Sequence, residues 1–245
     1  MQFKEKTKER QARFDPTHVN VKKLCSFYMV REYLINKSGS GLYRNRDFRE
    51  ACEAVGVNYN TVRSQFEFFE FYGLLVRNKQ KGFIKIVELT GKIGRLYKLF
   101  KTHRKAICAS SNPKVYFADL WKARLIKTNI VSQAYREAGK CKDSNNGKKL
   151  LKIVRGSRTP LGKKQGINLS LMTIGKVLGR TKGTAHRTIA RMAREGIMNV
   201  EKRSLFVCEA SEFDRHKRTE NLYGRLFIRE GKVFERLQNS YAFLV

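Results

Sequence analysis

One pattern occurs twice in the sequence, with a constant offset of 123 residues between corresponding positions. The first copy runs from Asp47 to Ile84 and the second from Ser170 to Val207. Two glycines and a threonine align identically, and apolar residues align around them. The aligned pairs are Phe48 with Leu171, Val55 with Leu178, Gly56 with Gly179, Thr61 with Thr184, Phe66 with Ile189, Phe69 with Met192, and Gly73 with Gly196. The repeat predicts two domains with the same local fold.

The first copy predicts two helices joined by a tight turn. Asp47 is a cap or a first-turn acid for a short helix that ends at Gly56, a residue suited to a left-handed backbone. The second helix begins near Asn58 or Asn60 and is amphipathic. Its inward face carries Val62, Phe66, Phe69 and Gly73. A leading helix over residues 22–36 is expected to cover this pair, and it buries Leu24, Phe27, Tyr28, Val30 and Leu34 in varying degree.

The second copy repeats the same arrangement. Ser170 caps a helix that Gly179 ends, and Thr181 or Lys182 begins the next helix. The inward face of that helix carries Ala185, Ile189, Met192 and Gly196.

An antiparallel hairpin with a basic tip is expected after each pair of helices. The first joins residues 74–77 to 83–88, and the second joins 197–200 to 205–208. Two helices and such a hairpin are typical of a winged helix-turn-helix domain. The fold class predicted is therefore mainly α with small β-hairpins (α+β): two winged helix-turn-helix domains joined by a basic helical and flexible segment.

The outward face of the second helix in each copy is the candidate for reading DNA bases. Arginine can bond guanine bidentately, and asparagine can bond adenine in the same way. The candidate base-reading residues are Asn58, Asn60, Arg63 and Ser64 in the first copy, and Lys182, Thr184, His186 and Arg187 in the second. Candidate contacts to the DNA backbone around them are Tyr59, Arg191 and the hairpin tips with Lys79, Lys81, Lys202 and Arg203.

The formal net charge of +31 indicates a polyanionic partner, because neutralising phosphates releases condensed counterions. More than half of the excess lies in residues 91–168, between the copies. Residues 92–107 predict a basic amphipathic helix with an apolar stripe of Ile93, Leu96, Phe100 and Ile107. Its candidate phosphate contacts are Arg95, Lys98, Lys101, Arg104 and Lys105, and Lys148 and Lys149 add two more in a flexible stretch downstream.

These patterns divide the chain into five segments. They are a basic N-terminal arm (1–13), winged-helix domain 1 (14–90), a basic helical connector (91–138), a flexible basic linker (139–166), and winged-helix domain 2 with a C-terminal extension (167–245). Residues 115–135 supply a second helix of the connector. The extension either completes the second domain or mediates a homodimer.

The sequence offers no arrangement for catalysis. The most basic segment holds only three carboxylates, too few to converge on Mg²⁺, and the chain has no phosphate-binding glycine loop. No histidines lie at ligand spacing, and the five cysteines never form a C-x-x-C pair. We therefore expect no catalytic residue, no metal site and no cofactor. No stretch is apolar enough to span a membrane, which predicts a cytoplasmic protein, nucleoid-associated or encoded by a phage or plasmid in a bacterial host.

In its order of elements over residues 14–210, the chain resembles the replication initiators of iteron-type plasmids and some phages. The resemblance implies that each winged helix inserts one helix into one of two successive major grooves, and that the protein represses its own promoter. It implies roles for Asn60, Arg63 and Ser64 in the first groove and for Lys182, His186 and Arg187 in the second.

Double-stranded DNA is thus the expected partner, bound by an initiator or a transcription regulator. Two other partners or roles stay open at this stage. One is a sequence-indifferent DNA-packaging, chromatin-like or virion-associated protein, and the other is an RNA-binding protein.

Overall fold

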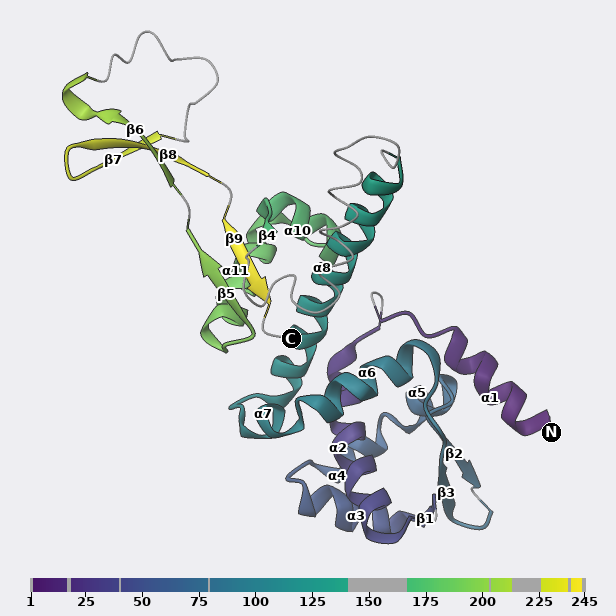
Figure 1. The fold of residues 1–245 in the computed structure, drawn as a ribbon. Coiled ribbons are helices and arrows are strands. Elements are labelled where there is room, and N and C mark those ends of the chain that lie inside the picture. The colour runs from purple at the N-terminus through teal and green to yellow at the C-terminus, as the bar shows by residue number, and fades with distance from the viewer. Residues whose placement is uncertain are drawn as a thin grey trace. The chain divides into compact units, whose positions relative to one another are not determined.

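The computed structural model describes residues 2–16, 19–39, 41–78, 80–140, 167–202, 204–212, 226–237 and 239–243. Within them the chain is a mixed α/β protein whose strands form small antiparallel sheets (Figure 1). It divides into two compact units, Met1–Trp121 and Lys122–Val245, and the division falls within one long helix. We call them the first and second unit.

The first unit contains the helices and strands up to the beginning of that long helix. They are α1 (Gln2–Ala12), α2 (Val21–Ser38), β1 (Leu42–Arg44), α3 (Asn45–Ala54), α4 (Tyr59–Arg63), α5 (Phe66–Phe71), β2 (Leu75–Asn78), β3 (Phe83–Ile86), α6 (Gly91–Thr102), α7 (Arg104–Ala109) and the start of α8 (Pro113–Lys140). The strands form one sheet in the order β1-β3-β2.

Helix α2 forms the centre of the first unit's core and confirms the predicted leading helix. Its Phe27 ring lies 4.6 Å from that of Phe69 at the end of the helix pair. The fully buried Tyr28 packs on Phe117 of α8 at 5.9 Å, and its hydroxyl donates a hydrogen bond to the Ile93 carbonyl oxygen. Burial raises the pKa of Tyr28 well above its usual value, so the hydroxyl stays a donor.

Helices α6 and α7 belong to this core. The predicted apolar stripe is confirmed, because Ile93, Leu96, Phe100 and Ile107 are all buried. The basic segment after residue 90 is therefore, up to Trp121, an integral part of the first unit, where we had expected a separate connector over 91–138. The reason is that its apolar stripe covers α2, as the contact of Phe100 with Tyr28 at 5.6 Å shows.

The N-terminal segment is also packed rather than free. In α1, Gln11 is buried, and its amide nitrogen donates to the carbonyl oxygens of Gly73 and Glu88. Its amide oxygen accepts from the backbone N–H and the hydroxyl of Thr90. We had expected residues 1–13 to form a basic arm. Instead, this one side chain joins α1 to the residues just before β2 and just after β3.

The described elements of the second unit after α8 follow the same order, with an insertion. They are β4 (Ile167–Asn168), α10 (Leu171–Leu178), α11 (Lys182–Arg194), β5 (Met198–Glu201), β6 (Ser204–Glu209), a 3-10 turn (Ala210–Glu212), β7 (Leu226–Arg229), β8 (Lys232–Arg236) and β9 (Ser240–Phe243). They form two sheets, β4-β9-β5 and β6-β8-β7.

The prediction of a hairpin directly after the second helix pair is wrong. Strand β5 pairs with β9, from Met198 opposite Phe243 to Glu201 opposite Ser240, and β6 pairs with β8. The apolar side chains explain this choice. Tyr241 and Phe243 of β9 are buried at 1% and 0% exposure, whereas Phe206 of β6 is 49% exposed. The predicted hairpin in the first unit is confirmed, since β2 and β3 pair from Leu75–Ile86 to Asn78–Phe83.

The sheet β4-β9-β5 thus corresponds strand by strand to β1-β3-β2. Residues 79–82 join the two hairpin strands of the first unit, and residues 202–239 join the equivalent strands of the second. The C-terminal strand completes the second sheet, which was one of the two predicted uses of the extension.

Candidate nucleic-acid interface

The tight turns between the paired helices are the same in both units. Gly56 and Gly179 hold left-handed backbones with φ of +67° and +60°, which costs a glycine no steric strain. The next N–H groups, of Val57 and Arg180, donate to the carbonyl oxygens of Cys52 and Gly175 at 2.8 and 2.9 Å. The first helix of each pair, α3 or α10, therefore ends with the same hydrogen bonds at positions 123 residues apart.

The second helix of each pair begins with an equivalent cap. The side-chain oxygen of Asn58 accepts from the Thr61 N–H at 3.1 Å, and that of Thr181 accepts from the Thr184 N–H at 3.3 Å. These caps satisfy N–H groups that have no partner within the helix. Ser170 caps α10 in the same way, as predicted, by accepting from Thr173 N–H.

Gly175 lets the two helices of the second unit approach closely. A Cβ atom at this position would lie 2.7 Å from the carbonyl oxygen of Arg180 in the turn. Its counterpart in the first unit is Cys52, whose buried thiol has a pKa raised by desolvation to about 11. The turn of the second unit is thus packed backbone on backbone.

The outward face of α11 is basic. Its inward residues Ala185, Ile189 and Met192 are buried, as predicted from their spacing, whereas Gly196, predicted on the same face, is exposed and lies beyond the end of the helix. Four of its exposed residues lie on one stripe at spacings of four: Lys182, His186, Ala190 and Arg194, with Arg187 beside them. Thr184 is half-buried, and its hydroxyl oxygen accepts a hydrogen bond from Thr181, so it serves the cap.

The corresponding face of the first unit has a different chemistry. Among the predicted base-reading residues, Asn58, Asn60, Arg63 and Ser64 are all exposed. The helix is interrupted after Arg63, where the Ser64 hydroxyl donates to the Thr61 carbonyl oxygen at 2.9 Å, and α5 continues from Phe66. Such a bond competes with regular helix geometry. The outward face of α4 therefore presents mainly amides and one guanidinium.

Arg63 shares a hollow of about 260 Å³ with the β2–β3 hairpin. Its lining consists of Asn45, Arg63, Phe66, Arg77, Asn78, Gly82, Phe83 and Ile84. Lys81, at the tip of the hairpin, is exposed, and Lys79 lies outside the described residues. The hollow thus brings together α4, α5, the β2–β3 hairpin and the start of α3. The sequence repeat alone could not place these elements relative to one another.

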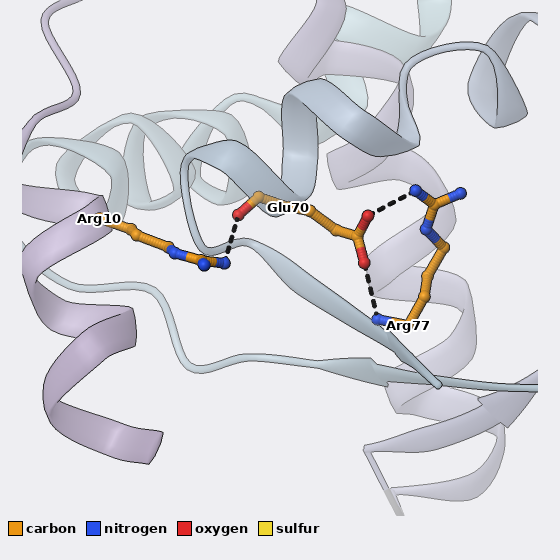
Figure 2. A network of polar contacts seen from close by, with 3 residues as sticks. All are labelled: Arg10, Glu70 and Arg77. Carbon is orange, nitrogen blue, oxygen red and sulfur yellow. Dashed lines mark hydrogen bonds and ion pairs between the residues drawn. The ribbon is translucent and has the colours of Figure 1, made fainter. Parts of the chain in front are cut away.

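Arg77 lines this hollow, and Figure 2 shows how Glu70 holds it. The Glu70 carboxylate accepts from the Arg77 backbone N–H at 2.9 Å and from its guanidinium at 2.5 Å. This hydrogen bond raises the pKa of Arg77. The Glu70 carbonyl oxygen accepts from Arg10 of α1 at 3.3 Å. Glu70 thus links the N-terminal helix, α5 and the hairpin.

Three exposed arginines of the first unit were not predicted as contacts. Arg44 lies just before α3, and Arg46 and Arg49 lie within α3, the first helix of the pair. Arg49 lies over the ring of Tyr59 at 5.3 Å, and Arg44 lies over that of Phe83 at 5.6 Å. The run RNRDFR at residues 44–49 is the signal that could have identified them, since it overlaps the start of the first copy at Asp47.

The remaining predicted backbone contacts are distributed over several elements. Arg95, Lys98, Lys101, Arg104 and Lys105 are exposed on α6 and α7, and Lys202 is exposed after β5. Arg104 also pairs with the buried Glu32 at 3.8 Å. Tyr59 and Arg191 are half-buried. Lys148, Lys149 and Arg203 lie outside the described residues, as does nearly all of the predicted linker.

The described residues contain no helix that is long and apolar enough to cross a membrane. In the same part of the chain, no three histidine, cysteine or carboxylate side chains gather in a way that could hold a metal ion.

No protein-family model matches the chain, and no characterised protein or solved structure matches it.

Proposed function

We propose that each unit is a winged helix-turn-helix domain and that the chain binds duplex DNA without catalysing a reaction. The observation that carries this proposal is the repeated turn, in which Gly56 and Gly179 end one helix and Asn58 and Thr181 cap the next. Because the same turn occurs twice in a chain of net charge +31, the favoured binding partner is a polyanion with a repeating shape.

In this proposal, α4 and α11 each enter a major groove. Asn58, Asn60, Arg63 and Ser64 read bases in one groove, and Lys182, His186 and Arg187 read bases in the other. Thr184 contributes through its cap. The exposed cations of α3, α6, α7 and the β2–β3 hairpin bind phosphates. Helix α4 itself carries little positive charge. The cations on the neighbouring elements of the first unit therefore supply most of that unit's attraction to phosphates.

Binding by both units makes the complex tight. Once one helix occupies its groove, the second unit is held at high local concentration and binds its own groove about one helical turn away. A protein of this kind acts at a defined site, in replication initiation or in transcription regulation. Both roles agree with the resemblance to plasmid and phage initiators.

A binding assay separates this proposal from its alternatives. The full chain is titrated with a duplex selected for affinity, with a random duplex and with folded RNA, each over a range of salt concentrations. We expect the selected duplex to bind most tightly, by roughly a thousandfold or more over random duplex. Equal binding to all duplexes would instead indicate a packaging protein, and tighter binding to RNA would reject the proposal.

A further inference from the structure

The strands β6, β8 and β7, which we call the extension sheet, interrupt the hairpin of the second unit. They lie within residues 202–239, where the first unit has only residues 79–82. A longer basic hairpin would be a simple explanation for such an insertion. The charges of the extension sheet argue against it.

The strands and the tight turn of the extension sheet, residues 204–209 and 226–236, carry three basic and three acidic side chains. Two of the cations lie in ion pairs within the sheet, Lys232 with Glu209 at 3.9 Å and Arg229 with Glu230 at 3.1 Å. This balance contrasts with a whole chain of net charge +31. The extension sheet is therefore poorly suited to bind phosphates.

Exposed apolar side chains mark it as a protein-binding surface instead. Among the described residues, three of the six large apolar side chains that are most exposed belong to it: Leu205 at 55%, Phe206 at 49% and Ile228 at 56%. Leu205 and Ile228 lie on the same face, because their partners Glu235 and Val233 are two residues apart on β8. Exposed apolar residues that gather in this way usually mark a contact with another protein.

The two edges of the extension sheet differ. Among the described strands, β8 is central, so β6 and β7 form the edges. A bulge between Phe206 and Cys208 breaks the regular register of β6, and bulges hinder pairing with another strand. Strand β7 pairs regularly with β8. The turn that joins them has positive φ at both Glu230 (+50°) and Gly231 (+72°), which matches the twist of a tight two-residue hairpin.

We propose that β7 pairs antiparallel with β7 of a second copy of the chain, which joins two extension sheets into one. The charges favour a second copy. Two chains of this net charge repel each other over most of their surface, and the balanced extension sheet is where they can meet. Antiparallel pairing centred on Ile228 is self-complementary and places the two Arg229 residues on opposite sides of the centre of the contact.

Sedimentation of the full chain without DNA tests this proposal. The wild-type chain should form dimers, and these should strengthen as salt screens the repulsion. Ile228→Lys should raise the dimer dissociation constant by about tenfold or more, because it places like charges close together on the paired strands. Leu205→Lys is the matched control, since Leu205 is equally exposed on the same face of the other edge strand, and it should leave the dimer intact.

Two results would overturn the proposal. One is a wild-type chain that remains monomeric at all concentrations. The other is equal loss of the dimer in both variants, which would indicate that the two copies meet through the sheet face that carries both Leu205 and Ile228, and not through the edge of β7. Circular dichroism checks that both variants fold. Binding of Ile228→Lys to a single DNA site is measured separately and should equal that of the wild type, so failure of the dimer and failure of DNA binding are distinguishable.

Discussion

Gly56 and Gly179 occupy the same place in two helix pairs and hold the same left-handed backbone, with φ of +67° and +60°. Each N–H donates to the carbonyl oxygen three residues earlier at 3.2 Å, in Glu53 and Lys176 respectively. The far ends of the second helices repeat this relationship, because Gly73 and Gly196 have φ of +64° and +67°. The two units are thus built around matching backbone geometry rather than around matching side chains.

Gly179→Ala should destabilise the second unit by about 1 to 2 kcal/mol, since a side chain strains a left-handed backbone. A Cβ atom there would meet nothing within 4 Å, so the cost comes from the backbone alone. Gly183→Ala in α11 is the matched control. A Cβ atom at Gly183 would also meet nothing within 4 Å, but the backbone there is helical. It should stabilise by about 0.5 to 1 kcal/mol. Thermal unfolding measures both, and a stabilising Gly179→Ala would contradict the turn geometry.

Gly175→Ala should both destabilise the second unit and weaken DNA binding. Its Cβ atom would lie 2.7 Å from the Arg180 carbonyl oxygen, so the turn before α11 must shift. Overpacking of this kind costs about 1 to 3 kcal/mol. Met172→Ala, at an exposed position of the same helix, is the control and should change little. Unfolding and DNA titration of both variants check this, and unchanged stability of Gly175→Ala would refute the close approach.

Gln11→Ala should destabilise the first unit by about 2 kcal/mol or more, because it leaves the Gly73 carbonyl and the groups around Thr90 without their partner. Lys8→Ala, at an exposed position of the same helix, should be nearly neutral. Denaturant unfolding of the two variants measures the difference. Equal stability would mean that α1 does not join the two ends of the hairpin.

Cys25 and Cys52 should resist alkylation in the folded chain. Burial raises the pKa of Cys25 to about 12 and that of Cys52 to about 11, so almost no thiolate is present at pH 8. Cys108 is exposed and should react before both of them. Site-resolved mass spectrometry after brief iodoacetamide treatment measures the order, and urea should remove the protection. Modification of Cys25 as fast as Cys108 would contradict the packing of α2.

Local features of the fold could be predicted from the sequence, and long-range pairing could not. The caps at Asn58, Thr181 and Ser170 follow from side chains within a few residues of the turn. The choice of β9 as partner for β5 depends on Tyr241 and Phe243, about 40 residues further along the chain. The break at Ser64 also escaped prediction, because a serine is compatible with either a continuous or an interrupted helix.

The same distinction applies to the candidate interface. The exposed faces of α4 and α11 follow from helical spacing, so Arg63 and Arg187 were predicted as solvent-facing residues and are exposed. The hollow beside Arg63 includes Arg77 and Asn45, which come from a strand and from another helix. Only tertiary packing brings these three residues to one place.

Hydroxyl-radical footprinting of the full chain on its selected duplex tests the central claim most directly. The account predicts two protected segments about one helical turn apart. Arg63→Ala should weaken protection of one segment and Arg187→Ala that of the other, each with a loss of about 1 to 3 kcal/mol, while Lys98→Ala should lower affinity for every duplex alike. A single protected segment, or equal affinity for unrelated duplexes, would contradict two DNA-reading helices in one chain.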